Sequence, residues 1–345
     1  QMVFCLNQSM TQSHTNVTSS SSPAAKAQAL WYVAPGRCEL RSEQLGQISG
    51  EALRIRTEAS AVSRGTERLV CSGLVPECEW QRMRAPLQEG DFPFPVKYGY
   101  ACAGRVEGGA GELVGSRVFC LHPHQTVFDI PAKHVVQIPS GVPSTRATLA
   151  ANLETALNAL WDGLPSPGDH ICVVGGGILG LLTGYLAARI PATRVTLVDT
   201  NAERKADADA MSCEFALPEM APQNQDLVFH ASASAEGLQT AFKAAGNGAT
   251  VVEISWYGNK EIPMVLGADF HSRRLILKSS QVGAIRPDRQ DRWTFKRRLE
   301  TALSLLDDPV LDRLVARRIA FQNAAEQLPL LLNSAEGLAP ILTYE

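Results

Sequence analysis

The chain has 345 residues, of which 45% are hydrophobic, and its formal net charge is -3 at pH 7. This length and apolar fraction are sufficient for two packed domains. The weakly acidic balance does not fit a nucleic-acid-binding domain, which carries clustered Lys and Arg. No apolar run reaches the roughly 18 residues that a membrane span needs. We therefore expect a small-molecule substrate, with no nucleic-acid partner and no membrane partner.

The first part of the chain differs from the rest. Residues 8–22 are rich in Ser, Thr, Gln and Asn, and such a segment cannot bury enough apolar area to fold. We predict a disordered tail over residues 1–25. The eight cysteines include no CxxC pair, so we interpret them as buried, reduced thiols of a cytoplasmic protein.

Three regions follow this tail. Residues 26–145 are predicted to be β-rich, because Gly and Pro separate short runs such as Ala52 to Arg56 and Gly115 to Cys120. Residues 146–283 alternate between strand and helix patterns, which is typical of a parallel, doubly wound sheet. Residues 284–345 contain a charged helix, a short strand, a second helix and a final strand.

The middle region is the most regular. Its predicted strands are His170 to Val174, Val195 to Val198, Asp226 to His230, Thr250 to Ser255 and Leu275 to Ser279. Its predicted helices are Ile178 to Ile190 and Ala202 to Met211. Each strand ends in small or polar residues, as expected where the carboxyl ends of parallel strands meet a ligand.

A glycine turn follows the first of these strands. Gly175, Gly177 and Gly180 match GxGxxG, with Ile178 and Leu179 before the last glycine. The first glycine permits the tight turn, the second lets a pyrophosphate approach the backbone, and the third lets the helix pack against the strand. The helix N-terminus then offers free N–H groups to the phosphates. We predict that these five residues bind a dinucleotide; a purely structural glycine turn is the alternative.

Asp199 indicates which dinucleotide binds. It ends the next strand, 19 residues after Gly180, close to the roughly 20 residues expected for the acid that binds the ribose 2′-hydroxyl. A carboxylate there accepts hydrogen bonds from the ribose diol and repels a 2′-phosphate. NAD is therefore favoured over NADP, although Arg204, five residues further on, leaves NADP open.

Four segments resemble the medium-chain dehydrogenase/reductase superfamily, over roughly residues 27–345. They are Ala61 to Glu67, Tyr98 to Val106, Leu149 to Trp161 with the following glycine turn, and Leu314 to Glu345. The resemblance implies an α/β fold with two domains. One is a GroES-like β-rich catalytic domain over residues 26–145 and 284–345, and the other is a Rossmann doubly wound parallel-sheet domain over residues 146–283.

The zinc ligands of that superfamily are replaced in this chain. Ser63 stands where the first ligand, a cysteine, is expected, and Tyr100 stands where the histidine of GHExxGxV is expected. The third ligand position falls near Ala150, where only Glu154 could substitute. The four-cysteine structural lobe is also missing. The resemblance therefore implies a branch without zinc, and Ser63 to Leu69 is similar to the bacteriochlorophyllide dehydrogenases, which lack the same ligands.

Without zinc, another group must give or take the proton. Tyr100 is the first catalytic candidate, because it occupies a former ligand position and a phenol can donate to a developing alkoxide. The other candidates are His122, Ser63 and Thr66. Histidine as a residue type suits proton relay, which applies to His122 and to the nearby His124, and the hydroxyls of Ser63 and Thr66 can pass a proton. Space filling by Tyr100, ordinary hydrogen bonding by the histidines and turn formation by the hydroxyl residues remain alternatives.

The resemblance also places Ser232, Ser255 and Ser280 near the cofactor. Glu67 is expected at the surface, paired with a neighbouring arginine. Together these residues predict a zinc-independent, NAD(H)-dependent alcohol or carbonyl oxidoreductase. The alternatives are an NADPH-dependent enoyl or quinone reductase of the same fold and a non-catalytic nucleotide-binding protein. Because dimers are common in the superfamily, we also expect a homodimer.

Overall fold

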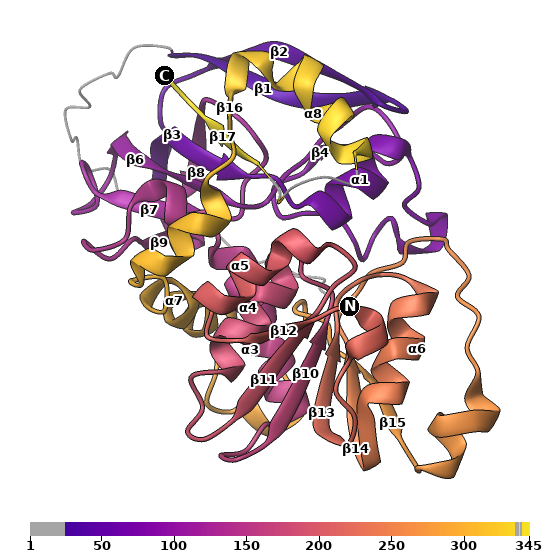
Figure 1. The fold of residues 1–345 in the computed structure, drawn as a ribbon. Helices are drawn as coiled ribbons and strands as arrows, with labels where there is room; N and C mark the ends of the chain where they lie inside the picture. Colours follow the sequence, from indigo (N-terminus) through magenta and orange to yellow (C-terminus); the bar gives the residue numbers. More distant parts are fainter. Residues whose placement is uncertain (1–24, 335–337, 339) are drawn as a thin grey trace.

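The structure is a computed structural model that describes residues 25–334, 338 and 340–345. The predicted tail over residues 1–25 lies outside this part of the chain, except for Ala25, which begins β1 (Ala25–Ala34). The described residues form a β-rich domain, drawn in purple and yellow, and a parallel-sheet domain, drawn from pink to orange (Figure 1). The predicted fold class is confirmed.

The parallel-sheet domain contains six strands in the order β12-β11-β10-β13-β14-β15. The strands are β10 (His170–Val174), β11 (Arg194–Val198), β12 (Glu214–Ala216), β13 (Gln225–His230), β14 (Ala245–Glu253) and β15 (Ile276–Ser279). The helices are α3 (Ala150–Gly163), α4 (Ile178–Ala187), α5 (Lys205–Ala210) and α6 (Ala235–Ala244). All five predicted strands are present, whereas sequence reasoning missed β12 and α6 and extended α4 three residues too far.

Both faces of this sheet are covered, which explains its continuous apolar strands. Along β10, Ile171 and Val173 pack into the core that holds α3 and α4. The alternate residues Cys172 and Val174 pack with Phe242 of α6 on the other face. Successive side chains of a strand point to opposite faces, and parallel sheets bury both of them.

The β-rich domain contains two sheets. The first has the order β2-β1-β5-β4, and the second has the order β16-β17-β3-β6-β7-β9, with β8 also paired to β3. These strands are β2 (Arg37–Leu45), β3 (Ala52–Ala61), β4 (Glu89–Gly90), β5 (Val96–Lys97), β6 (Cys102–Gly109), β7 (Arg117–Cys120), β8 (Val127–Pro131), β9 (Val135–Gln137), β16 (Arg318–Ala320) and β17 (Ile341–Thr343). The remaining helices are α1 (Arg64–Ser72), α2 (Ser144–Ala147), α7 (Phe295–Ser304) and α8 (Ala324–Asn333).

The end of the chain returns to this domain. β17 pairs antiparallel with β3, with Ile341 opposite Ala61, so the strand before α1 is held by residues from both ends of the sequence. The segment beyond β14 reaches α1 from the other domain, since a Cβ placed on Gly258 would lie 3.0 Å from Leu69 of α1. The segment that follows the carboxyl end of β14 therefore lies against α1. Among the described helices, none is both long and apolar enough to cross a membrane.

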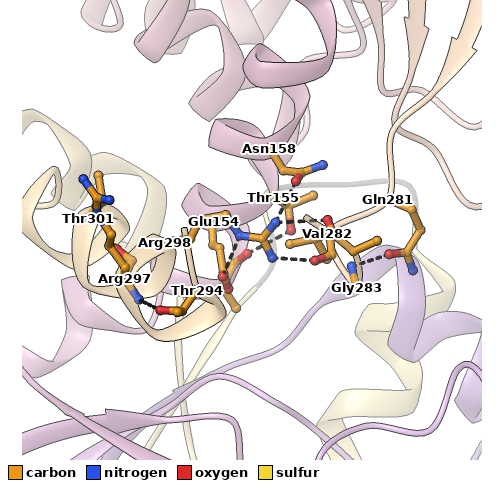
Figure 2. A network of polar contacts seen from close by, with 12 residues as sticks. Glu154, Thr155, Asn158, Gln281, Val282, Gly283, Thr294, Arg297, Arg298 and Thr301 are labelled. Carbon is orange, nitrogen blue, oxygen red and sulfur yellow. Dashed lines mark hydrogen bonds and ion pairs between the residues drawn. The ribbon is translucent and has the colours of Figure 1, made fainter. Parts of the chain in front are cut away.

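Arg298 of α7 joins this helix to α3 and to the segment after β15 (Figure 2). Its side chain is only 1% exposed. Nε donates to Glu154 Oε1 at 2.9 Å and Nη1 donates to Asn158 Oδ1 at 2.6 Å, both on α3. Nη2 donates to the Val282 carbonyl oxygen at 2.5 Å. A single guanidinium thus fixes α7, α3 and the segment after β15 relative to one another.

We predict that Arg298→Ala lowers the free energy of unfolding by about 3–5 kcal/mol, because it leaves the Glu154 carboxyl buried without its partner. Urea denaturation of the full chain measures this change. Arg297→Ala is the matched control on the same helix, since the Arg297 side chain lies over the Trp293 ring at 4.1 Å and should cost only about 0.5–1 kcal/mol. Equal effects of the two substitutions would show that Arg298 does not hold α7 against α3.

Candidate functional site

The glycine turn after β10 leads directly into α4. Gly175 has φ +113°, a conformation that glycine adopts far more readily than other residues. A Cβ on Gly180 would lie 1.8 Å from the Gly175 carbonyl oxygen, so α4 packs against the turn itself. A Cβ on Gly177 would meet no atom within 4 Å, and Gly177 is exposed. The backbone at this position is open to a ligand.

The first turn of α4 supplies free donors beside that opening. No side chain caps the N-terminus of α4, so its first N–H groups remain free for an anion. Ile178 and Leu179, which form this turn, pack part of their side chains against the main core. Their backbone, rather than their side chains, faces the opening.

Asp199, directly after β11, forms a hydrogen bond with the backbone of the glycine turn. Its Oδ2 accepts from the Gly176 N–H at 2.5 Å, and its Oδ1 accepts from the Asn201 N–H at 2.8 Å. Each carboxylate oxygen can accept a further hydrogen bond, so Asp199 can still bind the hydroxyls of a ribose. The turn, the uncapped helix and this carboxylate lie together and fit a dinucleotide.

We predict that Gly180→Ala and Gly177→Ala have opposite consequences. The methyl group of Gly180→Ala would collide with backbone, so the free energy of unfolding should fall by about 1–3 kcal/mol. The methyl group of Gly177→Ala has open space, so stability should change by less than about 0.5 kcal/mol while nucleotide affinity falls. Thermal denaturation and calorimetric titration with NADH separate the two effects. A Gly177→Ala protein with unchanged NADH affinity would contradict phosphate binding at this turn.

A buried carboxylate lies across the domain junction on α1. Glu67 is 0% exposed, which corrects the expectation that it pairs with an arginine on the surface. Its Oε2 accepts from the Tyr32 hydroxyl at 2.6 Å and lies 3.0 Å from His124 Nε2. Its Oε1 accepts from the Ser63 N–H at 2.7 Å. Burial alone would raise the pKa of Glu67, but the charge and hydrogen bond of His124, with the other donors, hold the pKa below its usual value.

Three of the predicted catalytic residues form one cluster in front of this carboxylate. The Tyr100 hydroxyl donates to Ser63 Oγ and lies 3.3 Å from Thr66 Oγ1. Burial raises the pKa of Tyr100, and its hydrogen bonds to the two hydroxyls offset only part of that rise. The phenol therefore keeps its proton at neutral pH.

The fourth predicted residue, His122, lies apart from the cluster. Its Nδ1 is 2.9 Å from the Pro123 carbonyl oxygen, and its ring stacks on Phe128 at 3.5 Å between centroids. Burial lowers the pKa of His122 to about 3, so the imidazole is neutral. In the described residues no hydrogen bond joins it to Tyr100. The histidine that belongs to the network is His124, whose Nδ1 lies 2.7 Å from Ser60 Oγ.

The residues that the sequence resemblance aligns with zinc ligands do not fit a zinc site. Ser63 and Tyr100 bond to each other, and Glu154 is held by Arg298 of α7. Zinc sites in proteins use Cys, His and carboxylate ligands that converge on one point. Within residues 25–334, 338 and 340–345, no three His, Cys, Asp or Glu side chains are grouped so that they could hold a metal ion.

The three predicted serines lie at strand ends, as expected, but in different surroundings. Ser232 Oγ is 2.6 Å from His230 Nε2. Ser255 Oγ accepts from the Ala233 N–H at 3.1 Å. Ser280 Oγ accepts from Asn158 Nδ2 at 3.0 Å. Sequence reasoning missed His230, although a histidine that ends the apolar run DLVFH is a recognisable signal for a polar group at a strand terminus.

Arginines from both domains gather around the start of α1. Burial lowers the pKa of Arg64, and the like charges of Arg68, Arg317 and Arg204 lower it further. Arg204 belongs to the segment that follows Asp199, so positive charge lies close to the loop after β11. Such a concentration of charge attracts anionic ligands.

No protein-family model and no curated protein matches the sequence. Solved structures match it over nearly its whole length. One, described as a zinc-binding dehydrogenase of Sinorhizobium meliloti bound to NADP, is 18% identical with a TM-score of 0.74, covering 92% of this chain and 99% of its own. An alcohol dehydrogenase of Escherichia coli complexed with NADH is 16% identical with a TM-score of 0.72, covering 92% and 99%. L-idonate 5-dehydrogenase of Escherichia coli is 12% identical with a TM-score of 0.75, covering 94% and 100%.

The chain has the fold of these dehydrogenases. At such identities the likeness concerns the backbone, and one fold serves many ligands. The glycine turn and the hydroxyl cluster at the start of α1 are therefore the features that indicate a function.

Proposed function

We propose that this protein is a zinc-independent, NAD(H)-dependent oxidoreductase that acts on an alcohol or a carbonyl compound. The observation that carries the proposal is the open, uncapped glycine turn with Asp199 beside it. Two solved structures of the same fold are bound to NADP and to NADH. A bound nicotinamide supplies or accepts a hydride, so the chain itself must hold the nucleotide and manage the proton.

The proposed nucleotide site follows from the turn. The N–H groups of Ile178, Leu179 and Gly180 receive the phosphates, and Gly177 gives them access to the backbone. Asp199 accepts hydrogen bonds from the adenosine ribose. This carboxylate favours NAD, whereas the arginine charge around Arg64 favours a 2′-phosphate. NADPH-dependent reduction of an enoyl compound or quinone is therefore the second candidate function.

Tyr100 is the proposed proton donor. Its phenol retains the proton, which it donates to Ser63 Oγ in this structure. With a carbonyl compound bound, this hydrogen turns to the carbonyl oxygen as negative charge develops there, and the phenolic oxygen accepts from Ser63 or Thr66 instead. Ser63 and Thr66 hold the phenolic oxygen in place. Glu67 is a positioning residue that acts through Ser63, because its Oε1 accepts from the Ser63 backbone N–H at 2.7 Å.

We predict that wild-type protein binds NADH more tightly than NADPH and purifies without stoichiometric zinc. Calorimetric titration with each nucleotide, with a metal assay on the same sample, measures both. Asp199→Ser should move the preference toward NADPH by about tenfold, because it removes a charge that repels the 2′-phosphate. Tighter NADPH binding by the wild type would favour the reductase function. Stoichiometric zinc would contradict a zinc-independent site, and the absence of binding would remove the enzyme proposal.

We also predict that Tyr100→Phe lowers kcat by about 100-fold without changing NADH affinity, because general acid catalysis is lost while the nucleotide site is intact. The assay follows NADH oxidation with the best substrate from a screen of ketones and aldehydes. Tyr98→Phe is the matched control, since the Tyr98 hydroxyl faces the Met83 carbonyl oxygen at 3.4 Å. Full turnover by Tyr100→Phe would show that another group donates the proton. Nucleotide binding without turnover of any substrate would support a non-catalytic role.

We further propose a cytoplasmic homodimer that pairs through β15. This strand is at the edge of the sheet in the described residues, and Ile276 on it is 54% exposed. An apolar sheet edge of this kind is a template for pairing. Sedimentation at micromolar concentration should show a dimer for the wild type and a monomer for Ile276→Asp. Leu330→Asp on α8, exposed to 71%, should remain dimeric. A monomeric wild type would refute this assembly.

A further inference from the structure

Two buried cysteines meet between the β1–β2 hairpin and α1. Cys38 lies near the start of β2, and Cys71 lies in the last turn of α1. Their side chains are 7% and 2% exposed. The turn of the hairpin reaches the helix at the same place, because the Gly36 N–H donates to the Cys71 carbonyl oxygen at 2.8 Å. The Cys38 thiol forms a hydrogen bond with the Cys71 thiol.

The same hairpin and the same helix also meet at the Glu67 carboxylate. Tyr32 stands opposite Cys38 in the hairpin, and the side chains of such a pair lie on one face. Glu67 precedes Cys71 by four residues on α1, so these two side chains also share a face. The Tyr32 hydroxyl donates to Glu67, and Cys38 meets Cys71 one helical turn further along. The contact that holds Glu67 therefore also holds the two sulfurs next to each other.

The two thiols differ in acidity. The hydrogen bond from Cys38, with a second one from the Gly36 backbone, lowers the pKa of Cys71, although burial and the charge of Glu67 oppose this. The same pairing, together with burial, raises the pKa of Cys38. The thiolate is the nucleophilic form of cysteine. Cys71 is therefore the reactive sulfur, and Cys38 holds a proton beside it.

A second pair of cysteines provides a comparison inside the same chain. Cys102 and Cys120 stand opposite each other on β6 and β7. Both side chains are 0% exposed. The pairing with Cys102 and burial raise the pKa of Cys120 well above its usual value. This pair has sulfurs close together but no access from solvent, so it serves as an internal control for a reaction at Cys38 and Cys71.

We propose that Cys38 and Cys71 form a redox site at which hydrogen peroxide, or a similarly small hydroperoxide, converts the two thiols into a disulfide. All the cysteines in the described part of the chain are free thiols, so this structure is the reduced form of the site. The inference does not depend on the proposed function, because no nucleotide takes part in the reaction.

The reaction has two steps. The Cys71 thiolate attacks one peroxide oxygen, the O–O bond breaks, and the leaving hydroxide takes up the proton that Cys71 lost, which gives water. Cys71 is then a sulfenic acid. The Cys38 sulfur attacks the Cys71 sulfur, so that the S–S bond forms, the S–O bond breaks, and a second water leaves with the Cys38 proton. The two thiols lose two electrons, and the peroxide is reduced to two waters.

The disulfide ties the hairpin covalently to the end of α1. Cys38 and Cys71 are 33 positions apart in the sequence, and a cross-link over such a distance restricts the unfolded chain. The hydrogen bonds of Glu67 hold α1 near its start, and the disulfide holds its last turn. Oxidation therefore stabilises the helix that begins at the hydroxyl cluster, and reduction releases it.

Disulfide mapping of the full chain tests the proposal. The Cys78→Ser chain is used, because Cys78 is exposed and competes for the oxidant. The folded chain is treated with hydrogen peroxide, its remaining thiols are alkylated, and its peptides are analysed by mass spectrometry without reduction. We expect a linked pair of peptides that contains Cys38 and Cys71, its loss after treatment with dithiothreitol, and no link between Cys102 and Cys120.

Thermal denaturation measures the consequence. Peroxide should raise the midpoint of the Cys78→Ser chain by about 3–8 °C, and dithiothreitol should reverse the rise. Adding Cys71→Ser should abolish the rise. Adding Cys172→Ser, at a buried thiol on β10 in the other domain, should retain it. The circular dichroism spectrum of each reduced variant reports whether the variant folds.

Four outcomes would overturn the inference. They are no link under conditions that oxidise glutathione, oxidation of Cys71 without a link to Cys38, equal linkage of Cys102 to Cys120, and a peroxide-induced rise that survives Cys71→Ser. The mapping uses a chain in which both proposed cysteines are intact, so a misfolded variant cannot decide the result. Each outcome leaves the proposed function standing, because nucleotide binding is measured separately.

Discussion

The buried Glu67 carboxylate is the constraint on which the β-rich half of the site depends. A charge without solvent is tolerated only when paired and fully hydrogen-bonded, and its partners come from distant parts of the chain. Tyr32 comes from β1, His124 from the segment before β8, and the Ser63 N–H from the start of α1. Satisfying this one group therefore fixes the N-terminus of α1. The hydroxyls that face Tyr100 lie there as a consequence, and not because each is held separately.

Arg298 is a second buried charge that holds elements from distant parts of the chain together. Its guanidinium on α7 forms hydrogen bonds with α3 and with the segment after β15. At a separate place, Gly258 lets the segment after β14 approach Leu69 closely. The segment after β14 therefore lies against α1, the helix that begins directly after Ser63. Removing one partner of a buried ion pair costs more than the pair contributes, so the contact of α7 with α3 depends strongly on Arg298.

The sequence predicted what depends on local pattern. Both faces of the parallel sheet are buried, so its strands are plain apolar runs, and the spacing of Gly175, Gly177 and Gly180 marks the turn directly. Residues whose environment is set by distant contacts were not predictable. Glu67 lies between Arg64 and Arg68 in the sequence and resembles a surface residue. Only its contacts with Tyr32 and His124 reveal its burial. His122 and His124 differ by two positions, and the ring stacking on Phe128 decides which of them is outside the network.

The proposed use of Tyr100 as proton donor, in place of a metal, has a consequence for the direction of the proposed chemistry. A metal stabilises an alkoxide without giving a proton, whereas a neutral phenol stabilises it by donating one. Burial makes the ionised form of Tyr100 costly, so at neutral pH this residue begins as a donor. In the reduction of a carbonyl compound, Tyr100 donates the proton that it already carries. In the oxidation of an alcohol, Tyr100 would first have to lose its proton in order to accept one, and its raised pKa opposes that loss. A site built from Tyr100, Ser63 and Thr66 is therefore better matched to reduction than to oxidation at neutral pH.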